Sequence, residues 1–184
     1  MNYFIDIKIN EHIYQIKDRM GVLMTLIIGS DKALLIDTGY GIYDIKEHIK
    51  SITTLPLIVV NSHGHMDHSC GNYLFDEVYI HKLDIDLCIL HNSVTWKNKN
   101  LSTAKSLNLI DDNYDTNTYI SSGEGNLKGL AYNQIFNLGN INVEVINMLD
   151  ELKQGNNTYL SRRLKTQVAK ARLGLSFYGK PYKM

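Results

Sequence analysis

Four side chains of the kind that bind metal ions lie within six residues of this chain, and they constrain it more than any other feature. They are His63, His65, Asp67 and His68. The cluster directly follows residues 57–60, a short hydrophobic run that predicts a buried strand, so its ligands lie in a loop at a strand end. Imidazole nitrogen and carboxylate oxygen together favour zinc or iron over calcium or magnesium. The cluster therefore predicts a metal site rather than a polar surface loop.

The spacing within the cluster suggests how the ligands are shared. His63 and His65 are two residues apart, so an extended backbone points both side chains in the same direction. Asp67 and His68 are adjacent and diverge. From the spacing alone, the second pair is better placed for a second ion than for the first.

The hydrophobic pattern predicts a mixture of short strands and helices. Strands are predicted over residues 5–9, 22–28, 33–36, 57–60, 78–81, 134–138 and 141–148, and helices over 42–53 and 82–91. Residues 92–133 are rich in Asn, Ser, Thr, Asp and Gly, and they predict an irregular insert, with a helix within 101–109 as one option. Residues 1–150 thus form one domain with this insert, and 151–184 form a basic tail, helical over 158–173 and extended beyond.

Composition restricts the class of protein. The chain has 184 residues, 44% hydrophobic and 21% charged, which suits one globular domain with at most a small appendage and excludes a largely disordered chain. No apolar run approaches the length of a membrane span, and the N-terminus lacks the features of a signal peptide. Cys70 and Cys88 are interpreted as buried small residues rather than ligands. We expect a cytoplasmic protein with reduced thiols and no membrane partner.

The charge is divided unevenly along the chain. Residues 1–150 carry 11 Lys/Arg and 18 Asp/Glu, net −7, whereas 151–184 carry 8 and 1, net +7. Leu160, Leu164 and Val168 recur at the helical spacing of four, so we expect residues 156–175 to form a helix docked on the body. Its basic side chains are expected near Asp111, Asp112 and Asp115. The other interpretation, a stripe that binds RNA, is less favoured, and we do not expect a nucleic-acid partner.

Two segments resemble one known family. His-Gly-His-Met-Asp-His at 63–68 resembles the H-x-H-x-D-H (HxHxDH) signature of the metallo-β-lactamase superfamily, and Leu-Leu-Ile-Asp-Thr-Gly at 34–39 resembles its first motif. The resemblance covers residues 3–91 and 134–148 and is strongest in the first half. It implies an α/β protein (α+β in some schemes), an αββα sandwich with a metal site at one edge of its two sheets, shortened in its second half.

The resemblance also implies a chemistry. His63 and His65 would hold the first ion and Asp67 and His68 the second, with one or two zinc ions, or iron, as cofactor. The implied enzyme is a hydrolase in which a metal-bound hydroxide attacks an ester, thioester, amide or phosphoester of a small-molecule substrate. Asp67 is then also catalytic, because it orients the water and passes on its proton. Asp37 is either an acceptor behind the ligands that fixes the loop or a strand-end turn residue.

The second half departs from the family pattern. No histidine follows His91, so the family's third His and last His have no counterpart, and its bridging Asp is not recognised. Asp150 or Glu151 could stand in, or lie in a solvated turn, and recruitment of His81 or His91 is a further option. The alternative function is therefore a catalytically impaired or inactive remnant that acts as a metal-binding or interaction module. Sheet surface left uncovered by the shorter second half predicts a homo-oligomer or a native protein that binds hydrophobic dye.

Overall fold

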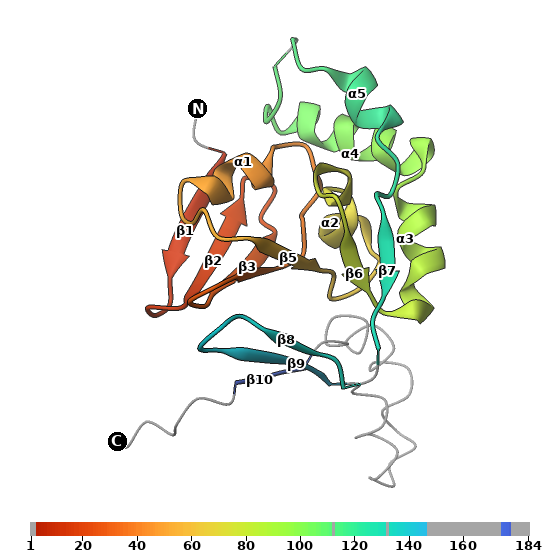
Figure 1. The fold of residues 1–184 in the computed structure, drawn as a ribbon. Coiled ribbons are helices and arrows are strands. Elements are labelled where there is room, and N and C mark those ends of the chain that lie inside the picture. Colours follow the sequence, from red (N-terminus) through yellow and green to blue (C-terminus); the bar gives the residue numbers. More distant parts are fainter. Residues whose placement is uncertain (1–2, 112, 132, 147–173, 178–184) are drawn as a thin grey trace, which may run out of the picture.

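Two sheets form the body of the protein in a computed structural model that describes residues 3–111, 113–131, 133–146 and 174–177 (Figure 1). The large sheet contains β1 (Phe4–Lys8), β2 (Ile13–Asp18), β3 (Leu23–Ile28), β4 (Ala33–Ile36), β5 (Leu57–Val60), β6 (Val78–Ile80) and β7 (Leu127–Gly129). The small sheet contains β8 (Ile135–Asn137), β9 (Asn142–Ile146) and β10 (Gly174–Phe177). The helices are α1 (Ile45–Lys50), α2 (Met66–Ser69), α3 (Ile85–His91), α4 (Val94–Ser106) and α5 (Thr116–Ser121), with 3-10 turns at Asn72–Leu74 and Lys82–Asp84.

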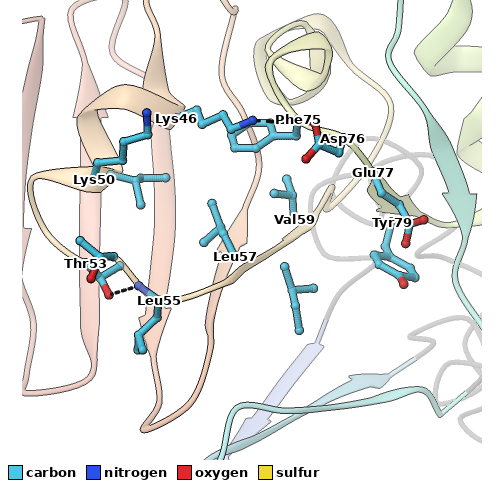
Figure 2. Close-up of a pocket in the computed structure, with 13 residues that line it drawn as sticks. Lys46, Lys50, Thr53, Leu55, Leu57, Val59, Phe75, Asp76, Glu77 and Tyr79 are labelled. Carbon is cyan, nitrogen blue, oxygen red and sulfur yellow. Dashed lines mark hydrogen bonds and ion pairs between the residues drawn. The ribbon is translucent and has the colours of Figure 1, made fainter.

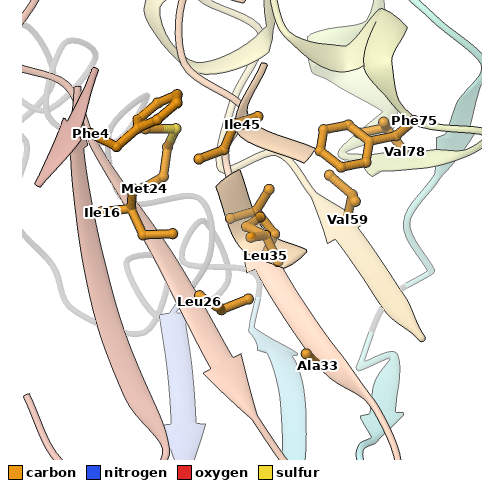
Figure 3. Close-up of a cluster of buried hydrophobic side chains, with 11 residues drawn as sticks. Phe4, Ile16, Met24, Leu26, Ala33, Leu35, Ile45, Val59, Phe75 and Val78 are labelled. Atoms are coloured by element: carbon orange, nitrogen blue, oxygen red, sulfur yellow. The ribbon is translucent and has the colours of Figure 1, made fainter. Parts of the chain in front are cut away.

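At β4 the large sheet is buried on both faces, and alternate side chains of the strand point to opposite faces. On β4, Leu35 joins the core beneath α1, where Ile45 and Met24 also lie (Figure 3). Its neighbour Leu34 points to the opposite face and packs in the cluster that contains Phe136 of the small sheet. All four residues of β4 are accordingly buried. Among the described residues the layers are helix, sheet and sheet, which are three of the four layers of the predicted αββα sandwich.

Strand direction places the ligand loops at one edge of the large sheet. β1 to β4 pair antiparallel, whereas β4, β5, β6 and β7 pair parallel. The carboxyl ends of β4 and β5 therefore lie side by side, and ligands bind at such ends in open α/β sheets. Asp37 follows β4 and the cluster 61–68 follows β5. Two segments that are distant in sequence thus meet at one point.

The predicted strands lie within a few residues of the observed ones, whereas the helices differ more. Helix α1 is shorter than the predicted 42–53, because Asp44 begins it as an N-cap that accepts a hydrogen bond from Glu47 N at 2.8 Å. Residues 92–133, predicted as an irregular insert, contain α4, α5 and β7. The pattern conceals α4 because two of its four buried residues are the polar Lys97 and Asn100.

The tail can be compared at only one place. Gly174 and Leu175, the last residues of the predicted docked helix 156–175, lie in β10, where Gly174 pairs with Ile146 and Leu175 with Val145. The docked-helix prediction is therefore wrong at these two residues, whereas the predicted extended end beyond residue 173 agrees with β10. Residues 174–177 alternate small or polar with apolar residues, which is a strand pattern. Residues 156–173, Asp112, Asp150 and Glu151 lie outside the described residues.

Candidate metal centre

The backbone of the ligand loop is held by hydrogen bonds to one carbonyl. His68 O accepts Thr38 N at 2.9 Å, Thr38 Oγ1 at 3.2 Å and Asn61 Nδ2 at 2.9 Å. Thr38 follows β4 and Asn61 follows β5, so the ends of two strands fix the same residue of the loop. The position of His68 is therefore set by the sheet.

A buried side-chain network supports this arrangement. Asn72 accepts from Thr38 Oγ1 at 2.8 Å and donates to Asn61 Oδ1 at 2.7 Å. Thr38, Asn61 and Asn72 are each at most 1% exposed. The sequence analysis did not identify these residues as functional, although Asn61 and Asn72 flank the cluster directly. Buried amides that are fully paired hold a loop in one conformation.

Asp37 links the loop to the sheet through its carboxylate. Oδ1 accepts Ser62 N at 2.7 Å, and Oδ2 accepts Ser62 Oγ at 2.8 Å and contacts His68 Nδ1 at 2.7 Å. Asp37 also has a φ of 68°, in the left-handed region that non-glycine residues rarely occupy. Asp37 therefore has both of the roles that the sequence suggested as alternatives. It is an acceptor that fixes the loop, and it is a turn residue at the end of a strand.

Three of the predicted ligands come together in the structure. One ligand atom from each of His63, Asp67 and His68 lies within 4.8 Å of the others. The rings of His63 and His68 have centroids 4.1 Å apart, whereas that of His65 is 4.8 Å from His63. The geometry therefore groups His63 with Asp67 and His68, a different grouping from the one the spacing favours.

His65 supplies the observation that tests whether a metal ion fits. Its Nδ1 atom is buried and has no hydrogen-bond partner among the described residues. A buried polar atom without a partner costs free energy, and a metal bond would satisfy it. The grouped donors, two imidazoles and one carboxylate, and the imidazole of His65 beside them are ligand types that zinc accepts. These residues fit a metal ion.

The charges around His68 favour a cation. Its Nδ1 lies 2.7 Å from Asp37 Oδ2 and its Nε2 lies 3.3 Å from Asp67 Oδ2. Burial lowers the pKa of His68, but hydrogen bonds and charge from these two carboxylates outweigh burial and raise it to about 10. Burial raises the pKa of Asp67, and the hydrogen bond and charge of His68 outweigh it and lower this pKa to about 2. The carboxylates of Asp37 and Asp67 thus converge on the ligand group.

The other residues considered from the sequence lie elsewhere or act differently. His81 begins the 3-10 turn, where its Nδ1 accepts Leu83 N at 3.3 Å. His91 packs against His65 but is not part of the ligand group. Cys70 and Cys88 are buried, as expected, and are also outside that group.

The pocket drawn in Figure 2 is separate from this centre. It has a volume of about 440 Å³ and lies between α1 and the strands β5 and β6, with Leu57, Phe75 and Tyr79 in its lining. None of the four predicted ligands lines it. Among the described residues, no helix has the length and apolar character needed to cross a membrane.

Comparison with known proteins agrees with this geometry. Residues 18–86 match the profile of the family described as the metallo-beta-lactamase superfamily. Acyl-coenzyme A thioesterase MBLAC2 of Bos taurus and that of Homo sapiens are each 31% identical to this chain over 103 residues. The aligned segment covers 48% of this chain and only 36% of the length of each relative.

Solved structures show the same fold at low sequence identity. The FEZ-1 metallo-beta-lactamase of Legionella gormanii is 18% identical and has a TM-score of 0.53, over 79% of this chain and 53% of that one. A HARLDQ motif mutant of the metallo-beta-lactamase from Cronobacter sakazakii is 13% identical with a TM-score of 0.52, over 77% and 53%. The profile match contains both Asp37 and the loop 63–68, and the solved structures share the fold, so residues 18–86 are similar in sequence to the metallo-beta-lactamase superfamily and the described residues have its fold.

Proposed function

We propose that this protein is a metal-dependent hydrolase of the metallo-β-lactamase fold and that acyl-coenzyme A thioesters are the substrate class to test first. One observation carries the metal: the buried, unpartnered Nδ1 of His65 beside the group of His63, Asp67 and His68. The substrate class is supported by the thioesterase activity named for the MBLAC2 relatives. Zinc is the metal that the donor set favours, as one ion or two, with iron as the second choice.

The residues of the loop have distinct roles in this proposal. A bound zinc ion would polarise the thioester carbonyl and ease the ionisation of water near neutral pH. His63, His65 and His68 offer ring nitrogens to the ion, and Asp37 orients the ring of His68. Without a metal, burial raises the pKa of Asp67 but the hydrogen bond and charge of His68 outweigh it and lower this pKa to about 2. In the proposal Asp67 orients the attacking water beside the ion.

The test combines metal content with turnover. His63→Ala and His65→Ala are each expected to lower bound zinc, because both side chains would be direct ligands. Asp67→Asn keeps the shape and removes the charge, so hydrolysis of an acyl-coenzyme A is expected to fall by about 100-fold or more, with a smaller loss of zinc. His12→Ala, a change at a histidine in the turn between β1 and β2, serves as the matched control and should retain wild-type zinc. Wild-type zinc in both ligand variants, by elemental analysis, would contradict the proposal.

A second candidate function is a metal-binding module without catalysis. It is favoured by the fact that all three grouped ligands among the described residues come from the single segment 63–68. Purified protein that contains zinc but hydrolyses neither thioesters, esters nor phosphoesters would support this function. Turnover that disappears with the zinc and returns when zinc is restored would exclude it.

A further inference from the structure

The ligand loop is held from two sides by different elements. Asp37 and Ser62 secure it on the side of the sheet, as described above. His91, the last residue of α3, lies on the opposite side of the loop. Its side chain is 8% exposed. Its Nδ1 accepts the backbone N–H of Met66 at 3.1 Å, and its ring lies 5.0 Å from the ring of His65, tilted by 59°.

Met66 N is an atom that needs a partner from outside its own helix. Met66 is the first residue of α2, and the first N–H groups of a helix have no intrahelical acceptor. His65 is the N-cap residue of this helix, but its side chain makes no capping hydrogen bond. His91 therefore supplies from α3 the acceptor that the N-cap residue does not supply.

The position of His91 is itself fixed. Its ring packs on that of Trp96 at 4.7 Å, and its carbonyl accepts Cys70 Sγ at 3.4 Å. The backbone of α3 also rests against Gly64, where an added Cβ would lie 2.5 Å from Asp84 O and 2.7 Å from Cys88 N. A histidine that is held this firmly can define the position of the group it contacts.

We propose that His91 is a positioning residue for the metal centre: by capping Met66 N and packing on the ring of His65, it directs Nδ1 of His65 toward the ion. The inference rests on the metal site proposed above. His91 is not a ligand through Nδ1, because the lone pair of that atom already accepts the N–H of Met66. Partners that orient a metal ligand are typically worth about 10- to 100-fold in metal affinity.

Two variants separate the capping bond from the ring packing. His91→Asn places Oδ1 near the position of Nδ1 and keeps the acceptor. His91→Phe keeps a ring against His65 and Trp96 but removes the acceptor. His81→Phe is the matched control, since His81 also accepts a backbone N–H through Nδ1, at the turn before α3 and outside the ligand group.

The measurements are the zinc dissociation constant, by competition with a chromophoric chelator, and the melting temperature of the metal-free protein. His91→Phe is expected to bind zinc about 10- to 100-fold more weakly than the wild type. His91→Asn is expected to retain most of the wild-type zinc affinity. The cobalt(II) spectrum should change in His91→Phe and stay close to wild type in His91→Asn. His81→Phe should retain wild-type zinc affinity, whatever its melting temperature.

The outcomes distinguish this inference from the proposed function. If the wild type binds zinc and His91→Phe binds it equally well, the role of His91 is overturned but the metal site is not. Equal losses in His91→Phe and His91→Asn would show that the acceptor is not what positions His65. A wild type that binds no zinc or cobalt would overturn the metal site itself, and with it this inference.

Discussion

Lys97 lies wholly buried on α4, where its ammonium group donates to Ser122 Oγ and, at 3.0 Å, to the carbonyl of Gly123. The rings of Tyr73 and Tyr119 each lie with their centroids 5.2 Å from Nζ. Burial lowers the pKa of Lys97 below its ordinary value of 10.5, because the charged form loses its contact with water. This side chain therefore binds its proton less firmly in the folded protein than in the unfolded chain.

The shift predicts a pH dependence of stability. In the window just below pH 10.5 the unfolded chain holds more protons on Lys97 than the folded protein, so the contribution of Lys97 to the free energy of unfolding rises as the pH rises through that window. Lys97→Met removes the titration while filling a similar volume. Urea denaturation at pH 7, 9 and 10 measures the free energy of unfolding of both proteins. That of the wild type should rise relative to that of Lys97→Met as the pH increases. A constant difference between the two proteins would contradict the prediction.

Single residues were predictable where their type and spacing were unusual. The ligands at 63–68 stand out because histidine is uncommon and three fall together. Asn61 and Asn72 do not stand out, since asparagine is typical of exposed loops. Their burial depends on Thr38, which lies 34 residues before Asn72 and is brought to it by the pairing of β4 with β5. No local pattern contains that information.

Among the elements, α3 and the ligand loop are joined by close backbone packing. Gly64 permits this approach because a Cβ there would overlap main-chain atoms of Asp84 and Cys88. Most strands were predictable because each is a continuous or alternating apolar run, but β2 and β7 were not predicted. Only the second half of α4 overlaps the helix considered within 101–109, because the buried face of α4 mixes Lys97 and Asn100 with Leu101 and Ala104. Hydrophobic periodicity fails where polar side chains are buried with partners.

Substitution of Gly64 tests the contact between these two elements. Gly64→Ala is expected to lower the free energy of unfolding by about 1–3 kcal/mol and to weaken zinc binding, since rigid backbone must move to admit the methyl group. Gly129→Ala on β7 is the matched control, because the atoms nearest its added Cβ belong to the flexible side chain of Lys82. Chemical denaturation and zinc titration of both variants provide the measurement. If both variants lose equally little stability and zinc affinity, α3 can move away from Gly64 without disturbing the ligand loop.

At the scale of the whole molecule, the small sheet covers only part of the large one. Ile27 on β3 is fully buried against the small sheet, but Leu23, on the same face of β3, is 45% exposed. On the edge strand β1, Ile5 and Ile7 point to this face through their pairing with β2 and are 61% and 41% exposed. The sequence predicted two facing sheets but not this coverage, because the extent of the small sheet depends on pairing between β9 and β10, segments separated by 27 residues.

These exposed side chains predict association. We expect the native protein to self-associate or to bind a hydrophobic dye, because exposed apolar side chains at a sheet edge favour contact with another molecule. Replacing Ile5 and Ile7 together by threonine keeps the preference for strand and should reduce both effects, as measured by light scattering and dye fluorescence. Leu107→Thr, at a single exposed leucine after α4, is the control. A monomeric wild type without dye fluorescence would show that these exposed side chains do not cause association.

The order of the strands has a consequence for how this protein is made. β1 to β7 lie in the large sheet in the same order as in the chain, so each strand that leaves the ribosome finds its partner already present. Asp37 and Thr38 are synthesised before the histidines that they hold, and α3 follows directly after them. All the elements that hold the ligand loop are therefore synthesised before the small sheet, so the loop can take its shape while the chain is still being made.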